Sequence, residues 1–69
     1  MLDKVERAIR VLEVEAEMNE AQAKRFAELA SYLSPSDHKV KMEALSTEAL
    51  EKAAEIRSQI CHMRAHEKN

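Results

Sequence analysis

The sequence predicts an all-α protein, a two-helix antiparallel hairpin that pairs with a second copy as a homodimeric four-helix bundle. Three observations predict it. The 69 residues contain no glycine and a single proline, Pro35, near the middle of the chain. Apolar residues recur every three or four positions on both sides of this proline. On each side the apolar arc is wider than one antiparallel neighbour needs.

The stretch SYLSPSDHKV, residues 31–40, predicts where one helix ends and the next begins. Proline is accepted at the first position of a helix, where its missing N–H would be unpaired. It also disfavours helical dihedrals in the residue before it. We therefore expect Ser34 to cap the second helix and Asp37 to place its charge near the positive helix end. The single domain, 1–69, then has helices at about 2–33 and 35–65, a turn at 34 and a frayed tail at 66–69.

The apolar positions of each helix form two neighbouring lines. The first helix has a seam with 3–4 spacing: Leu2, Val5, Ile9, Leu12, Ala16, Asn19, Ala23, Phe26, Ala30 and Leu33. The seam of the second helix is Met42, Ala49, Ala53, Ile56, Ile60 and Met63. The adjoining lines are Val11, Met18, Leu29 and Tyr32 in the first helix, and Val40, Leu50, Ala54 and Cys61 in the second.

One apolar line can close the hairpin, and the other would be an exposed patch unless a second copy covers it. We expect the core or dimer seam to include Ile9, Leu12, Asn19, Phe26, Leu50, Ile56 and Ile60. Asn19 interrupts the first seam. A buried asparagine in such a position can fix register or oligomeric state; proximity to a wet dimer edge is the alternative.

Composition and charge exclude several classes of protein. The formal net charge is −2, with basic and acidic residues interspersed, which disfavours a general nucleic-acid binder. A DNA-binding helical dimer stays a weaker alternative. No apolar run approaches the roughly 18 residues of a membrane span, and the charged N-terminus has no signal-peptide pattern. The lone Cys61 fits a reduced compartment. We expect a cytoplasmic protein that contacts neither membrane nor nucleic acid.

The sequence offers little for catalysis or metal binding. His62 and His66 are four residues apart beside Cys61, but a structural zinc site normally has four ligands. A glycine-free chain has no phosphate-binding loop. Cys61 has no evident base and orienting group arranged as a catalytic nucleophile requires. We therefore expect no enzyme activity, no cofactor and no metal.

Arg57 is the residue whose position asks most for an explanation. It lies near the middle of the second helix's apolar arc, and an unpaired buried guanidinium is too costly. It is either a structural partner of Glu15, within a hairpin or across the dimer, or a hot-spot arginine that binds another protein. The remaining alternative is a solvated side chain. Residues 11–23 contain four glutamates and no basic residue, which forms either a solvated face or a surface for a basic partner. The expected partner-binding residues are Arg57, Tyr32, Glu13, Glu17 and Glu20.

In its length and in the pattern AQAKRFAELASYLSPSDHKVKMEAL, the chain resembles the small anti-quorum-sensing anti-activators of temperate pseudomonad phages. The resemblance implies a helical homodimer that binds the DNA-binding domain of a LuxR-type transcription regulator and blocks operator binding. It also implies a second host target, the type IV pilus assembly ATPase. It supplies no site residues. The alternative is a structural dimerisation or adaptor hairpin with no inhibitory role.

Overall fold

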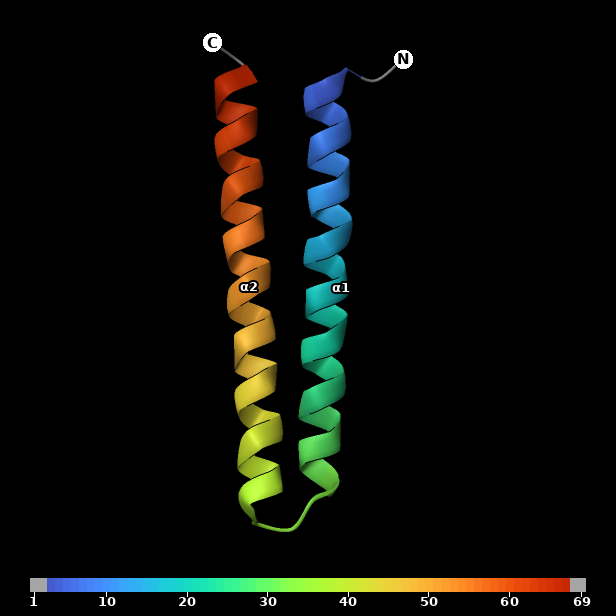
Figure 1. The fold of residues 1–69 in the computed structure, drawn as a ribbon, viewed down its shortest axis with the longest axis vertical. Helices are drawn as coiled ribbons and strands as arrows, with labels where there is room; N and C mark the ends of the chain where they lie inside the picture. The colour runs from blue at the N-terminus through green and yellow to red at the C-terminus, as the bar shows by residue number, and fades with distance from the viewer. Residues whose placement is uncertain (1–2, 68–69) are drawn as a thin grey trace.

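A computed structural model describes residues 3–67, which form two antiparallel helices, α1 (Lys4–Tyr32) and α2 (Asp37–Glu67). The helices lie side by side along their whole length, with both chain ends at one end of the rod and the loop at the other (Figure 1). The Cα positions span 51 × 20 × 11 Å. The predicted all-α hairpin is confirmed. Within the described residues, neither helix has an apolar segment that would cross a membrane.

Helix α1 is closed at both ends by local hydrogen bonds. The carboxylate of Asp3 accepts a hydrogen bond from the backbone N–H of Glu6 at 2.8 Å, which satisfies one of the unpaired donors of the first turn. At the other end Leu33 is extended, and its N–H donates to the carbonyl of Ala30 at 3.2 Å. The predicted start at residue 2, and Leu2 in the seam, lie outside the described residues.

Helix α2 begins two residues later than the sequence predicted. Its cap is Ser36, whose hydroxyl accepts from the N–H of Lys39 at 3.3 Å and whose carbonyl accepts from the N–H of Val40 at 3.2 Å. The assignments of Ser34 as the cap and Pro35 as the first helical residue were therefore wrong. Pro35 lies in the loop before the cap, and Asp37 does lie in the first turn, where its charge suits the helix dipole.

The second helix also ends later than predicted. It continues through His66 to Glu67. The prediction of a frayed tail from residue 66 was therefore wrong for residues 66 and 67, which are helical. Arg64 and His66 lie in its last turn, where basic side chains suit the negative end of the helix dipole. Residues 68–69 of the predicted tail lie outside the described residues.

The central parts of the predicted seams form the core of the hairpin, whereas Val5 and Leu33 at the ends of the first seam are exposed, 38% and 37%. Every seventh residue of α1 from Ile9 onward is buried, and the seam positions between them are half-buried. The buried core residues are Ile9, Ala16, Ala23, Ala30, Ala49, Ala53, Ile56 and Ile60. The half-buried seam residues of α1 are Leu12, Asn19 and Phe26. Leu50 is 54% exposed and lies outside this core, so within the hairpin it does not act as a seam residue.

The sequence analysis missed two half-buried residues of the second seam, Leu45 and Ser46. Ser46 is the one that makes a polar contact. It lies four residues after Met42 and three before Ala49, at the spacing of the seam, and it is half-buried. Its hydroxyl donates to the backbone carbonyl of Ala23 on the other helix at 2.8 Å. This side-chain bond between the helices requires the close backbone approach that alanine permits.

Candidate interaction surfaces

Two ion pairs join the helices along one side of the hairpin. The guanidinium of Arg57 binds the carboxylate of Glu20 through two bonds, Nε to Oε2 at 3.0 Å and Nη2 to Oε1 at 2.6 Å. Nη2 of Arg64 lies 3.6 Å from Oε1 of Glu13. The acidic partners are seven residues apart, and so are the basic ones, so both pairs repeat one geometry a heptad apart. We call these four residues the ladder.

Within the hairpin, the pairing of Arg57 with Glu15 that the sequence suggested is wrong, because the partner is Glu20. A pairing of these two residues across a dimer stays a prediction. Side chains on a helix lean toward its N-terminus. In this antiparallel hairpin Arg57 therefore leans toward the loop, and Glu20 leans toward the chain ends. The two side chains therefore meet although their Cα atoms lie at different heights along the hairpin. Pairing residues by equal distance from the loop does not take this difference into account.

The ladder changes the electrostatics of the acidic stretch. The hydrogen bonds from Arg57 hold the pKa of Glu20 below its ordinary value of 4.5, and its charge adds to this effect. The same bonds, and then the charge of Glu20, raise the pKa of Arg57; the charges of Glu17 and Glu13 also contribute. Two of the three glutamates expected to meet a basic partner thus have an arginine partner within the chain. The side chains of Arg57 and Glu20 are still 48% and 43% exposed.

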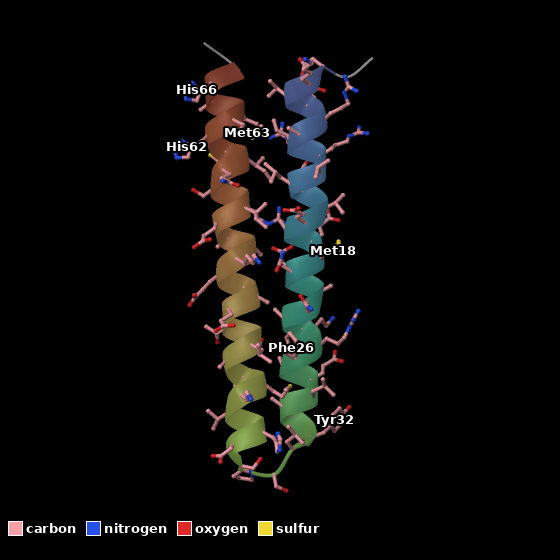
Figure 2. All side chains as sticks on the ribbon, in the orientation of Figure 1. Met18, Phe26, Tyr32, His62, Met63 and His66 are labelled. Atoms are coloured by element: carbon pink, nitrogen blue, oxygen red, sulfur yellow. The ribbon has the colours of Figure 1, made fainter. Side chains whose placement is uncertain are left out.

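The structure brings together four of the five expected partner-binding residues. Glu13, Glu20 and Arg57 belong to the ladder, and Glu17 lies close enough to affect Arg57. Tyr32 is separate: it is 85% exposed at the loop end of α1 and points away from α2 (Figure 2). At 1.5 Å per residue, Tyr32 lies about 18 Å along α1 from Glu20. These five residues therefore do not form one contiguous site in the hairpin.

Asn19 hydrogen-bonds within its own helix. Its side-chain Nδ2 donates to the carbonyl of Glu15 at 2.8 Å, and the residue is half-buried. This bond satisfies one N–H of the side-chain amide locally, as asparagine often does on a helix. The role in fixing register or oligomeric state stays a prediction.

A line of exposed apolar side chains runs along the back of α1, opposite the seam. Its members, which we call the outer stripe, are Val11, Val14, Met18, Leu29 and Tyr32. Figure 2 shows Met18 and Tyr32 on the side of α1 that faces away from α2. Four of the five were predicted as a second apolar line; Val14 was missed, although it lies three residues after Val11. All five are at least half exposed.

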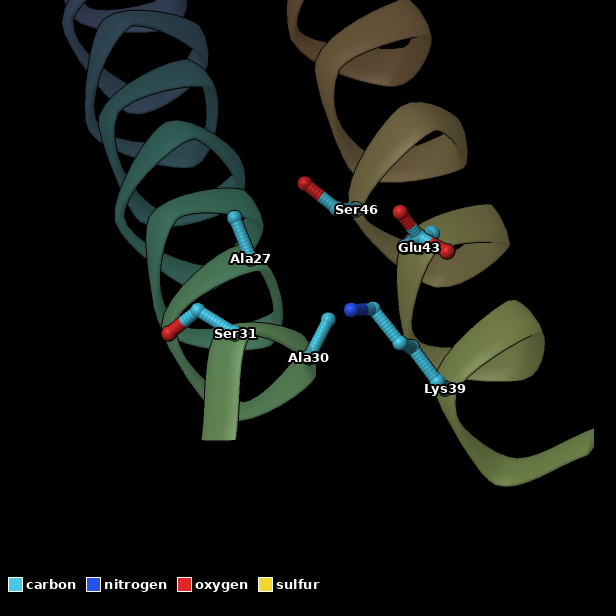
Figure 3. A pocket seen from close by; sticks show the side chains of 6 residues that line it. All are labelled: Ala27, Ala30, Ser31, Lys39, Glu43 and Ser46. Carbon is cyan, nitrogen blue, oxygen red and sulfur yellow. The ribbon is translucent and has the colours of Figure 1, made fainter. Parts of the chain in front are cut away.

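A shallow hollow of about 340 Å³ lies between the helices near the loop. Its lining consists of Ala27, Ala30, Ser31, Lys39, Glu43 and Ser46 (Figure 3). Figure 3 shows the ammonium of Lys39 extending from α2 toward Ala30. Small side chains, Ala27, Ala30, Ser31 and Ser46, leave this space between the helices. No sequence motif marks such a hollow, so the sequence analysis did not predict it. Among the described residues, no group of three or more His, Cys, Asp or Glu is placed to hold a metal ion.

Comparisons with family models, with curated proteins and with solved structures found no match to this chain. The interpretation of function therefore depends on three features of the hairpin: the ladder, the outer stripe and the absence of a deep cavity among the pockets described.

Proposed function

We propose that the protein is a non-catalytic binding protein, a homodimer of two hairpins arranged as four helices, that inhibits another protein by covering its surface. The observation that carries this proposal is the outer stripe, which suits a second copy and leaves the ladder as the surface for a target. A hairpin that buries one apolar line and leaves five large apolar side chains in a second one has more contact surface than its own fold uses.

The target we propose is the DNA-binding domain of a LuxR-type transcription regulator, with the type IV pilus assembly ATPase as a second target in the cytoplasm of a bacterial host. The resemblance to phage anti-activators suggests these targets. The ladder side suits the first, because a DNA-binding domain is basic and the carboxylate of Glu17, which belongs to neither ion pair, lies beside the half-exposed carboxylates of Glu13 and Glu20. Leu50, exposed on α2, adds an apolar contact one heptad before Arg57.

Inhibition would then be steric. A hairpin about 51 Å long that lies on the DNA-binding surface excludes the operator without any chemical step. Charge of opposite sign would speed the encounter and orient the two proteins.

An assembly adaptor is the second candidate, and the same outer stripe favours it. In that case the stripe would pack permanently against a different protein. The adaptor would be poorly soluble alone, because the patch would face water. A stable homodimer at micromolar concentration would argue against it.

The test is a displacement assay with a LuxR-type regulator bound to fluorescent operator DNA. Fluorescence anisotropy should fall as the protein is added. The informative variant exchanges Glu20→Arg with Arg57→Glu, which keeps an opposite-charge pair between the helices but changes where each charge lies. It should lose inhibition. Single variants are less useful, because each would leave one charge of the pair without its partner.

The matched control exchanges Glu48→Lys with Lys52→Glu. These side chains are exposed on α2 and line a shallow pocket with Asn19 and Gln22, away from the ladder. This control has the same net charge as the other double variant and should still inhibit. No displacement by the wild-type protein would refute the proposed target. Equal inhibition by both double variants would refute the ladder as the contact surface.

A further inference from the structure

We infer that the outer stripe is the dimer interface, with α1 of one copy antiparallel to α1 of the other about a two-fold axis at the level of residue 20. This inference rests on the homodimer proposed above and adds the face and the register. In such a pair, a residue at position n lies opposite the residue near position 40 minus n on the second copy.

Three apolar residues of the outer stripe fit this register. Val11 and Leu29 are equidistant from residue 20, so each would lie opposite the other residue in the second copy. Met18 would lie beside the axis, opposite Gln22 of the partner helix and close to its small neighbour Ala21. These three residues are exposed in the hairpin, so nothing within the chain competes for them.

The charges beside the stripe fit the same register. The exposed residues Glu15 and Arg25 lie beside the stripe, and their midpoint is residue 20. An antiparallel dimer therefore places each Glu15 opposite the Arg25 of the other copy. A parallel, in-register dimer would place each residue opposite its like-charged copy, which is unfavourable.

The ends of the stripe add a third agreement. Arg7 and Tyr32 both lie on the outer side of α1, and their midpoint is also within one residue of position 20. Arginine packs favourably over the face of an aromatic ring. Both side chains are exposed in the hairpin, so each would be available to the other copy.

The other exposed apolar residues do not offer a comparable surface. On α2 the large ones in the described part of the chain are Val40 and Leu50, two residues against the five of the outer stripe. The ladder side presents mainly charged groups. The stripe is therefore the face that a second copy would cover, and the ladder would stay accessible for a target.

Crosslinking between introduced cysteines tests the register. With Cys61 changed to Ser, Val11→Cys and Leu29→Cys would be prepared separately and treated with a short bismaleimide, alone and mixed. The mixture should give a crosslinked dimer. Val11→Cys alone should give far less, because its two copies would be about 27 Å apart at 1.5 Å per residue. Val40→Cys on α2 is the negative control.

Each other outcome would overturn the inference in a distinguishable way. Efficient crosslinking of Val11→Cys alone would indicate a parallel dimer. No crosslinking in a protein that sediments as a dimer would place the interface on another face. A wild-type protein that sediments as a monomer at 100 times the concentration used in the operator-displacement assay would refute both this inference and the proposed homodimer. The operator-displacement assay tests the proposed target independently of the dimer.

A pair of glutamate variants gives a second measurement. Met18→Glu should weaken dimerisation by a factor on the order of 100, because two carboxylates would be buried near the axis. Val40→Glu is the matched control, since Val40 and Met18 have nearly the same exposure, 64% and 65%. It should leave the dimer intact. Circular dichroism should show both variants helical; a Met18→Glu protein that stays dimeric would refute the interface.

Discussion

The half of the hairpin next to the chain ends and the half next to the loop are held together in different ways. Near the chain ends, Ile9, Ile56 and Ile60 form an apolar cluster with Ala16, Leu12 and Met63. The two arginines of the ladder, Arg57 and Arg64, also lie in this half. Near the loop the buried residues are alanines, and the polar contact between helices is the hydrogen bond from Ser46 to Ala23.

The difference follows from how the chain connects the helices. At the loop, residues 33–36 keep the two helix ends close, and closing such a short loop costs little conformational entropy. Small side chains are sufficient there. At the open end no covalent link opposes separation, so larger apolar side chains and ion pairs must hold the helices together.

The largest expected effect is in the open half. Ile60→Ala would remove most of a side chain that is 7% exposed, and loss of such a buried side chain costs about 2–5 kcal/mol. Met42→Ala in the loop half should cost less, because Met42 is only half-buried. Urea unfolding followed by circular dichroism would measure both free energies.

These two variants must be compared at one protein concentration, because dimerisation would add to the apparent stability. Equal losses at the two sites would contradict the division into a strongly packed open half and a weakly packed loop half. A larger loss for Met42→Ala would reverse it.

A second prediction separates close packing from empty space within the loop half. Ala23→Leu should destabilise the hairpin by about 1–3 kcal/mol, because Ala23 is buried against Ser46 and a larger side chain would force the helices apart. Ala27→Leu should change stability by less than about 0.5 kcal/mol, because Ala27 is exposed at the edge of the hollow. Thermal unfolding would compare them. Tolerance of leucine at position 23 would show that the helices can separate there without cost.

Periodicity was enough to predict the hairpin and most of its core. The seam of α1 repeats every seven residues from Ile9, and a buried line must follow the helix period, so the pattern and the burial agree. Ser46 was missed because a polar residue in a seam breaks an apolar pattern. Its spacing from Met42 and Ala49 was the available signal.

Periodicity was not enough for contacts that depend on direction. The partner of Arg57 is decided by the lean of two long side chains toward opposite ends of the rod, and residue types alone do not encode this offset. The cap of α2 was missed for another reason. Ser34 and Ser36 flank Pro35, and either can cap a helix; which one does so depends on how many residues the loop needs to cross between the helices.

The cap assignment gives a third, smaller prediction. Ser36→Ala should destabilise the hairpin by about 1 kcal/mol, because the N–H of Lys39 would lose its hydroxyl partner. Ser34→Ala, the matched control one residue before Pro35, should have an effect within about 0.5 kcal/mol. The comparison uses urea unfolding at neutral pH. A larger effect at Ser34 would restore the earlier start of the helix.

The smallest expected effect concerns the ladder and depends on pH. Because Arg57 lowers the pKa of Glu20 in the folded protein, the unfolded chain binds the proton more tightly. The resulting stabilisation is fully present above the ordinary pKa of 4.5 and is lost as the pH falls through the lower folded value. Glu20→Gln lacks this titration. The difference in unfolding free energy between wild type and Glu20→Gln should therefore shrink between pH 6 and pH 3.

Glu48→Gln is the matched control, because Glu48 belongs to neither ion pair of the ladder. A difference that stays constant over this range would mean that the Arg57–Glu20 pair adds nothing to the cohesion of the open half in water, and that the isoleucine cluster alone holds it.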